Sequence, residues 1–262
     1  MNNSDLIKVA HLLKSARHVG VLTGAGISAE SGIPTFRDSQ TGLWANFKVE
    51  DLATREAFER NPDFVWQWHV ARRIMLRNTF PNPGHRVIAW LADAVDQLTL
   101  ITQNVDGLHQ AAGSPIVHEL HGNIKRTKCF KYGHPIEQSL ADNHPDSPPE
   151  CPVCGSLARP DVVWFGEVLP TKVFGIANDA TIHADLFFVI GTSGHVQPAA
   201  AFGLMALESG ATVVVINPDP DSAIPGGMFL QGLSGVILPQ LVKHGWGIPA
   251  SVFQDQVSTR KF

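Results

Sequence analysis

Residues 18–29, HVGVLTGAGISA, join a short apolar run to a glycine turn, and this stretch decides the fold. The apolar run at residues 18–22 predicts a buried strand that ends at Gly24-Ala-Gly26. The turn matches the pattern G-x-G-x-x-A, whose glycines let the backbone approach a pyrophosphate beside a helix N-terminus. Glycine turns follow many strands, so this match needs support from the rest of the chain.

Similar apolar runs recur along the chain, at residues 98–102, 186–191 and 212–217. Helical patterns lie between them at residues 85–95 and 199–209, and a first helix is predicted after a cap at Asn3 or Ser4. Continuous apolar strands that alternate with helices are typical of a parallel sheet covered on both faces. The sequence therefore predicts an α/β fold with a doubly wound parallel sheet.

Polar or glycine-rich peptides follow each predicted strand, at residues 23–26, 102–106, 191–193 and 217–219. Each peptide alone can be explained as an ordinary turn. In a doubly wound sheet, however, ligands bind beyond the carboxyl ends of the strands. Four such peptides together predict a ligand-binding cleft at this edge of the sheet.

Two segments interrupt the alternation of strands and helices. Residues 39–80 are rich in Trp and Phe, with a helical pattern at 64–76, and residues 121–164 contain all three cysteines. We interpret both as insertions that together form a smaller lobe. The expected organisation is a single domain over residues 1–262, with inserted segments at about 39–80 and 122–161.

The composition excludes several classes of protein. The 262 residues carry a net charge of -4 without a basic block, which disfavours a protein that binds nucleic acid by neutralising phosphates. The apolar runs are much shorter than the ~18 residues of a membrane helix, and no secretory signal is recognisable, so no membrane association is expected. Three cysteines are too few for a disulfide scaffold, which predicts a cytoplasmic protein.

A dehydrogenase is the first enzyme class that the glycine turn suggests. Such an enzyme would carry an Asp or Glu at the end of a second strand ~20 residues after the turn. Here the chain continues with SGIPTFRD at residues 31–38, which does not read as a strand. This departure disfavours hydride transfer.

Five segments taken together resemble the sirtuin family: residues 24–38, 102–109, 118–122, 159–167 and 191–193. They occur in family order within residues 20 to 235. The resemblance implies NAD-dependent removal of acyl groups from lysine, on a Rossmann-like large domain with a small lobe made of a helical and a zinc-ribbon-like module. Within the family, the chain is most similar to bacterial sirtuins of the desuccinylase type.

The resemblance also implies which residues bind NAD. Ala25, Phe36 and Arg37 would belong to the cofactor loop, and the amide and carboxylate groups at the end of the second strand would hold nicotinamide and ribose. The complete implied set is Gly24, Ala25, Gly26, Phe36, Arg37, Gln103, Asn104, Asp106, Gly191, Thr192, Ser193, Asn217 and Ser234.

His121 is the expected general base, with Asn104 beside it as a second catalytic residue. In the family, the acyl oxygen attacks C1′ of the nicotinamide ribose, and a base then activates a ribose hydroxyl. A neutral imidazole suits that task near pH 7. The chain has 12 histidines, most of which must be structural. Only its place in His-Gly after the Gln-Asn-Val-Asp segment distinguishes His121, so His109 and His118 are expected to be structural.

The peptide substrate is expected to lie along the segment that holds Val162, Trp164, Phe165 and Gly166. In the family, an extended peptide pairs with this segment as a strand, and aromatic rings surround the acyl-lysine. A plain buried strand is the alternative, and it is the better explanation for Val163.

Two C-x-x-C pairs hold zinc in the family, and this chain keeps only one of them, Cys151 and Cys154. The other pair begins at Cys129, but its partner position is Tyr132, which is not a credible ligand. His134 can complete a Cys3His site. A metal-free lobe is the alternative, and the sequence leaves the choice open.

The choice of acyl group depends on Ala53, His69 and Arg72. Desuccinylase-type sirtuins bind the acyl carboxylate with a Tyr and an Arg spaced Y-x-x-R, and here His69 takes the place of the tyrosine. A histidine can also donate to a carboxylate, which favours acidic acyl groups. Alternatively, Arg72 pairs with an acidic neighbour and the pocket takes acetyl or longer neutral chains.

Three functions are compatible with the sequence. The leading hypothesis is a protein-lysine deacylase whose substrates are acyl-lysine proteins or peptides. ADP-ribose transfer to protein, or NAD hydrolysis, on the same fold is the first alternative, and a non-catalytic NAD or ADP-ribose binding module is the second. Retention of Asn104, Asp106 and His121 together favours the deacylase.

Overall fold

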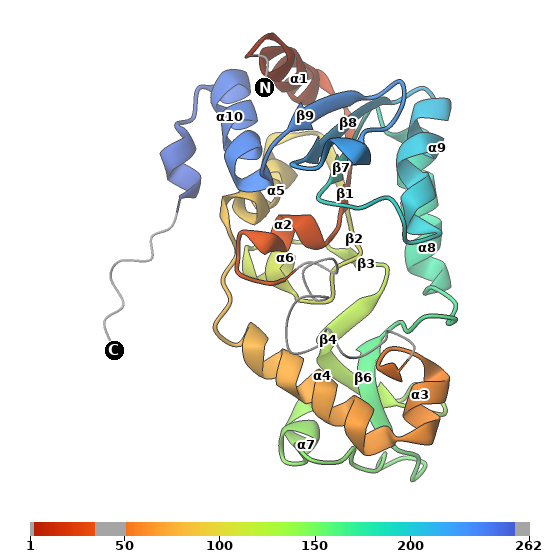
Figure 1. Cartoon of the computed structure of the whole chain (residues 1–262). Helices are drawn as coiled ribbons and strands as arrows, with labels where there is room; N and C mark the ends of the chain where they lie inside the picture. The colour runs from red at the N-terminus through yellow and green to blue at the C-terminus, as the bar shows by residue number, and fades with distance from the viewer. Residues whose placement is uncertain (1–2, 35–50, 255–262) are drawn as a thin grey trace.

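The computed structural model describes residues 3–34 and 51–254, and its larger part is built on a parallel sheet (Figure 1). The sheet has six strands in the order β3-β2-β1-β7-β8-β9, and every neighbouring pair is parallel. The strands are β1 (His18–Thr23), β2 (Gln97–Thr102), β3 (His118–Glu119), β7 (Leu186–Ile190), β8 (Thr212–Asn217) and β9 (Met228–Gln231). The predicted α/β fold class is confirmed.

The register brings the carboxyl ends of the central strands to one level. Thr23 at the end of β1 pairs with Thr102 of β2 on one side and Ile190 of β7 on the other. The order of the strands along the chain reverses between β1 and β7, which is where ligands bind in doubly wound sheets. The glycine turn after β1 therefore starts at the switch point of the sheet.

Helices cover both faces of this sheet (Figure 1). One face packs against α1 (Asn3–Ser15), α5 (Pro83–Ala94) and α10 (Ser234–Trp246), and the other against α8 (Thr171–His183) and α9 (Phe202–Glu208). Successive side chains of a strand point to opposite faces, so Phe188 lies in the first core and Phe187 in the second. This double burial explains why the strands are apolar without alternation.

A second, three-stranded antiparallel sheet forms the centre of a smaller lobe, at the lower end of Figure 1. Its strands are β5 (Pro135–Ile136), β4 (Gly122–Cys129) and β6 (Ala158–Val162), in that order, and its helices are α3 (Arg55–Arg60), α4 (Pro62–Leu76) and α7 (Gln138–Asp142). We call these elements the small lobe. Both of the segments predicted as insertions contribute to it, and their exact limits stay a prediction.

Helix α4 begins two residues before the helical pattern predicted at residues 64–76 and ends with it. The Asn61 side chain accepts a hydrogen bond from the Phe64 N–H, and Pro62 occupies the first turn, where no N–H is needed. Val65, Trp66 and His69 lie on the buried face of the helix. The packing of this face fixes the position of His69, one of the acyl-group candidates, in the small lobe.

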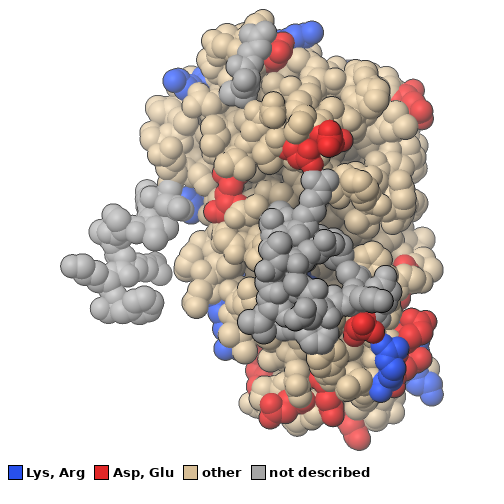
Figure 2. All heavy atoms as spheres, in the orientation of Figure 1, with Lys and Arg blue, Asp and Glu red and all other residues tan. Residues whose placement is uncertain are grey.

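The surface carries charges of both signs next to one another, as Figure 2 shows at the lower end of the molecule. Ion pairs such as that between Arg60 and Asp51 (3.1 Å) join some of them. None of the helices within residues 3–34 and 51–254 combines the length and the hydropathy that crossing a bilayer requires.

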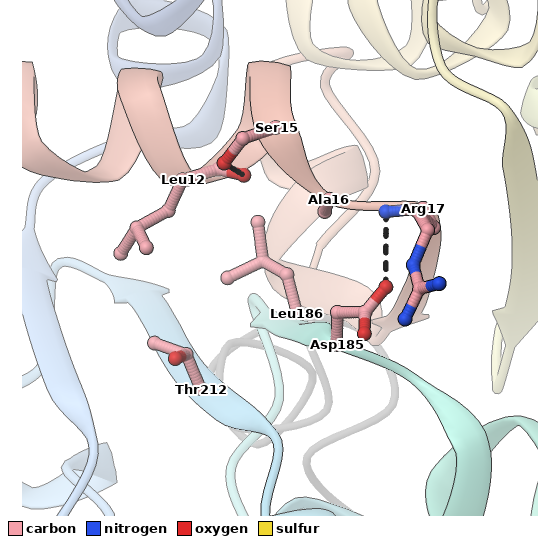
Figure 3. A pocket seen from close by; sticks show the side chains of 7 residues that line it. All are labelled: Leu12, Ser15, Ala16, Arg17, Asp185, Leu186 and Thr212. Atoms are coloured by element: carbon pink, nitrogen blue, oxygen red, sulfur yellow. Dashed lines mark hydrogen bonds between the residues drawn. The ribbon is translucent and has the colours of Figure 1, made fainter.

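The edge of the large sheet opposite the glycine turn contains a hollow of about 170 Å³ (Figure 3). Asp185 lies in it and accepts hydrogen bonds from the backbone N–H groups of Arg17 and His18, both at 2.9 Å. These bonds lower the pKa of Asp185. The hollow contains none of the predicted site residues, and Asp185 there joins the start of β7 to the start of β1.

Candidate active site at the strand ends

The glycine turn is packed directly against the end of β7. The N–H of Gly24 donates to the Ile190 carbonyl (3.0 Å), and that of Gly26 donates to the Gly191 carbonyl (2.8 Å). A β-carbon on Gly26 would lie 2.7 Å from the Cα of Gly191. The glycines are therefore required because two backbones meet here, and this contact exposes the turn at the carboxyl edge of the sheet.

A hydrogen-bonded cluster connects this turn, with Ala25 in its first helical position, to the end of β2. Asn104 donates from Nδ2 to the Gly24 carbonyl (3.0 Å) and to Ser28 Oγ (3.1 Å). Ser28 in turn donates to Asp106 Oδ2 at 2.8 Å. The predicted pair Asn104 and Asp106 thus lies at the switch point. Ser28 was not predicted, and its only signal is its place inside the G-x-G-x-x-A pattern.

Asp106 is a buried carboxylate, only 6% exposed. Burial raises its pKa, although hydrogen bonds from the Leu108 N–H and from Ser28 oppose that shift. A buried acceptor with two donors among the described residues is suited to a ligand that donates further hydrogen bonds, such as a carboxamide or a hydroxyl.

Two buried histidines lie behind this cluster, with ring centroids 4.9 Å apart. His109 shares a 2.9 Å hydrogen bond with Thr23 Oγ1, and His85 lies 3.5 Å from Ser28 Oγ. Burial lowers both pKa values, that of His85 to about 4. The two rings are therefore neutral at pH 7. The His109 ring is bonded to a side chain of the central strand, in line with the structural role expected for it.

His121 has the geometry of a general base. Its Nδ1 lies 2.9 Å from the Gln103 carbonyl, which can only accept, so Nδ1 carries the proton and Nε2 keeps a lone pair. Burial lowers the pKa of His121, and the bond to Gln103 partly offsets this. The imidazole is therefore unprotonated at pH 7. The carbonyl of His121 also accepts from the Val163 N–H (2.9 Å), which links it to the predicted peptide segment.

The other predicted cofactor residues lie at the ends of β7 and β8 and at the start of α10. Asn217 donates to the Thr192 carbonyl (2.8 Å), and Ser234 donates to Glu30 (3.1 Å). Ser193 next to them is exposed. All three stretches lie at the carboxyl edge of the sheet. Phe36 and Arg37 lie outside the described residues.

The segment at residues 162–167 forms a tight turn held by an ion pair between buried Arg159 and partly exposed Glu167. Arg159 is only 3% exposed; its guanidinium lies 3.3 Å from the centre of the Trp164 ring and binds both carboxylate oxygens of Glu167. Glu167 also accepts from the Trp164 N–H at 2.9 Å. Although burial opposes it, the bonds from Arg159 lower the pKa of Glu167. No role was predicted for Arg159 or Glu167.

The predicted peptide-binding residues in this turn differ in their burial. Val162 and Trp164 are buried, whereas Phe165 is half-exposed and Gly166 has a φ of +83°. The Phe165 N–H donates to the Ala53 carbonyl at 2.9 Å, which brings Ala53 to the same place. Phe165 and Gly166 thus lie at the surface beside the buried Trp164 ring.

The acyl-group candidates His69 and Arg72 lie one turn apart on α4. The His69 ring is 2% exposed and its centroid is 6.0 Å from that of Trp164. The Arg72 guanidinium lies 4.7 Å from the centre of the Trp68 ring, and none of the described residues forms an ion pair or hydrogen bond with it. Its neighbour Arg73 instead donates to the Thr127 hydroxyl at 2.9 Å. Of the two arginines, only Arg72 is left for a ligand.

The four metal-ligand candidates meet at one point of the small lobe. The ligand atoms of Cys129, His134, Cys151 and Cys154 all lie within 4.8 Å of one another. The Cys129 and Cys154 Sγ atoms are 3.4 Å apart, and Cys151 Sγ is 3.7 Å from His134 Nδ1. Tetrahedral zinc with bonds of about 2.0–2.3 Å places its ligand atoms about 3.5–3.8 Å apart. These residues therefore fit a Cys3His zinc site.

The environment of Cys129 also favours a metal-binding thiolate. Burial raises the pKa of this thiol, but hydrogen bonds, first among them the one from the Tyr132 N–H, outweigh burial and lower the pKa to about 6. The Tyr132 side chain itself is 62% exposed, so this residue contributes its backbone and not its phenol.

Fold and site together define an α/β protein with a glycine turn at the switch point of its sheet, a histidine held by the Gln103 carbonyl at the strand ends and a small lobe fit for zinc. The model of the Sir2 family matches residues 24–198. The chain belongs to the Sir2 family.

Relatives and solved structures agree with this assignment. An NAD-dependent protein deacylase of Pyrobaculum aerophilum is 48% identical over 245 residues, which cover 91% of this chain and 95% of that protein. The crystal structure of a Sir2 homologue with NAD superposes with a TM-score of 0.82 at 40% identity, covering 91% of this chain and 93% of that one. A Sir2 protein bound to a myristoylated histone peptide superposes with a TM-score of 0.74 at 33% identity, covering 93% and 97%.

Proposed function

We propose that this chain is an NAD-dependent protein-lysine deacylase that uses His121 as its general base. The products are nicotinamide, an O-acyl-ADP-ribose and free lysine. The observation that carries the proposal is the fixed tautomer of His121, whose Nδ1 is bonded to the carbonyl of Gln103, the residue before Asn104, so that Nε2 keeps its lone pair. Deacylase relatives at 44–48% identity support the reaction class.

NAD would lie across the carboxyl edge of the sheet and supplies an electrophilic C1′ with nicotinamide as leaving group. Gln103, Asn104 and Asp106 hold the nicotinamide ribose end. The turn at Gly24, Ala25 and Gly26 holds the diphosphate, together with Thr192 and Ser193, and the adenosine lies toward Asn217 and Ser234. In the reaction, His121 Nε2 takes a proton from a ribose hydroxyl.

The substrate is an acylated protein or peptide; Sir2 proteins similar to this chain have been solved with a myristoylated histone peptide and with a p53 peptide and NAD. Its backbone would pair with the turn that contains Val162, Phe165 and Gly166, and its acyl-lysine would enter beside Trp164. The ion pair of Arg159 and Glu167 keeps that turn in place. We place the reaction in the reducing cytoplasm, since all three cysteines are free thiols at metal-ligand distance.

Mass spectrometry of peptides tests this proposal directly. One peptide sequence is prepared with acetyl-, succinyl- or butyryl-lysine and incubated with and without NAD. We expect loss of the acyl group only with NAD, together with one O-acyl-ADP-ribose for each lysine released. Consumption of NAD with ADP-ribose on protein or free in solution would replace the proposal by the transferase or hydrolase alternative, and binding of NAD without turnover would replace it by the binding module.

The Arg72→Met variant is expected to lower kcat/KM for succinyl-lysine about 10- to 100-fold and to change acetyl-lysine turnover little. Arg72 has no ion-pair partner among the described residues, so its guanidinium can bind an acyl carboxylate through charge-assisted hydrogen bonds. Paired kinetics on the two peptides measure this. Arg77→Met is the control, because Arg77 lies at the end of the same helix, away from its buried face. Equal losses on both peptides would make Arg72 structural.

A further inference from the structure

His69 is a polar ring in aromatic surroundings. It lies on the buried face of α4, with the Trp68 ring edge-on at 4.5 Å and the Trp164 ring at 6.0 Å between centroids. If the acyl-lysine enters beside Trp164, as the proposed function has it, the His69 ring lies within reach of the acyl chain. Burying a polar group among aromatic rings costs free energy unless the group forms a hydrogen bond.

The tautomer of His69 is fixed by the helix that carries it. Its Nδ1 lies 2.8 Å from the Val65 carbonyl one turn earlier, and a carbonyl can only accept, so Nδ1 carries the proton. Burial is the main cause that lowers the pKa of His69, and the positive charges of Arg72, Arg73 and Arg159 add to it. The ring is therefore neutral, and its Nε2 is a hydrogen-bond acceptor.

This result changes the role expected for His69. Donation to an acyl carboxylate requires a proton on Nε2, and the neutral tautomer bonded to Val65 has none there. None of the described residues donates to Nε2. Arg72, one of the charged side chains near His69, has its guanidinium over the Trp68 ring instead. Nε2 is therefore open to a donor from water or from a bound molecule.

The acyl chain itself can provide that donor if it carries a hydroxyl group. We propose that His69 makes this deacylase selective for hydroxylated acyl groups, whose O–H donates to His69 Nε2. The proposal rests on the proposed function. It applies to neutral chains and also to acidic ones, since Arg72 lies one helical turn further along the same face and remains available for a terminal carboxylate. His69 Nε2 and the Arg72 guanidinium would thus bind two different groups of one acyl chain, a hydroxyl group and a carboxylate.

The test compares matched peptides that differ by a single hydroxyl group. They are butyryl-lysine against 2-hydroxybutyryl- and 3-hydroxybutyryl-lysine, and glutaryl-lysine against 3-hydroxyglutaryl-lysine. We expect at least one hydroxylated member to have a kcat/KM about 10-fold above its plain partner, because its hydroxyl group bonds to an acceptor that none of the described residues satisfies. In the His69→Phe variant this ratio falls to about 1 or below, while plain butyryl-lysine is still turned over.

Two further variants separate selectivity from damage to the fold. His69→Gln keeps an acceptor and is expected to retain part of the preference. His183→Phe is the control, because His183 forms the same kind of bond to the carbonyl one turn earlier (2.9 Å) but is exposed on α8. It should leave every ratio unchanged.

Each outcome is decisive. A wild-type ratio near 1 for all pairs overturns the proposal. An equal fall for plain and hydroxylated peptides in His69→Phe also overturns it, and assigns Nε2 to the amide N–H of the acyl-lysine or to a water molecule. If the wild type turns over none of the peptides, the proposed function is overturned instead. The role of His69 is then decided by the ratio of the dissociation constants of the plain and hydroxylated peptides, measured by calorimetry.

Discussion

The His121→Ala variant is expected to lose about 10²- to 10⁴-fold in kcat/KM for deacylation while NAD binds nearly as tightly as in the wild type. The imidazole is the only group that this substitution removes from the strand ends. The bonds of Asn104 to Gly24 and of Ser28 to Asp106 do not involve it. Steady-state kinetics and a calorimetric titration with NAD measure the two quantities separately.

The pH dependence of kcat/KM provides a second test of the role of His121. A base works in its unprotonated form, and burial places the pKa of His121 below the usual 6.5. Wild-type kcat/KM should therefore fall at acid pH with a midpoint below pH 6.5 and reach a plateau on the alkaline side of that midpoint. The residual activity of His121→Ala should lack that fall. His118→Ala serves as control, because His118 lies on β3 three positions earlier and no catalytic role is assigned to it. Unchanged turnover, or lost NAD binding, in His121→Ala would contradict the assignment of the base.

Removal of the metal is expected to have the largest effect on stability. In His134→Ala, or in wild type treated with a chelator, the bound zinc is lost and Tm falls by about 10 °C or more, because metal binding at such a site contributes directly to folding. The four candidate ligands come from the end of β4, the turn after it and the loop before β6, so a metal held by them would join the strands of the small lobe. Metal content by elemental analysis and a thermal melt check the two parts of this prediction.

Two matched variants sharpen the metal experiment. Tyr132→Phe should keep the zinc, since Tyr132 contributes only its backbone N–H to Cys129. His134→Cys should also keep it, because a thiolate is an equally good ligand. Equal zinc content in wild type and His134→Ala would show that the lobe is metal-free or that a different group is the fourth ligand.

The main strands of the large sheet were predictable because each buries both faces and therefore reads as an apolar run. β1, β2, β7 and β8 lie where the runs predict them, within one residue at each end. β3 and β9 were not predicted, because edge strands of two and four residues are too short to give a pattern. α8 and α10 were also missed, and Pro239 inside α10 is a residue that normally argues against a helix.

The site was predictable where a motif carried it and not where contacts between distant residues made it. Asn104, Asp106 and His121 were identified from their places in the motifs. Ser28 was not, because its bond to Asp106 joins residues 78 positions apart in the sequence. The neutral state of the His69 ring was equally out of reach, since it depends on burial by the fold and on the charge of Arg159, which is distant in the sequence, as well as on Arg72 and Arg73 of its own helix.

The pairing of β1 with β7 has a consequence for the synthesis of this protein. Val19 pairs with Leu186, so the central strand leaves the ribosome roughly 8–30 s before its neighbour at rates of about 5–20 residues per second. During that interval one edge of an apolar strand has no partner, and such edges pair readily with other chains. The yield of folded protein should therefore rise when translation is fast or when a chaperone covers the nascent N-terminal segment.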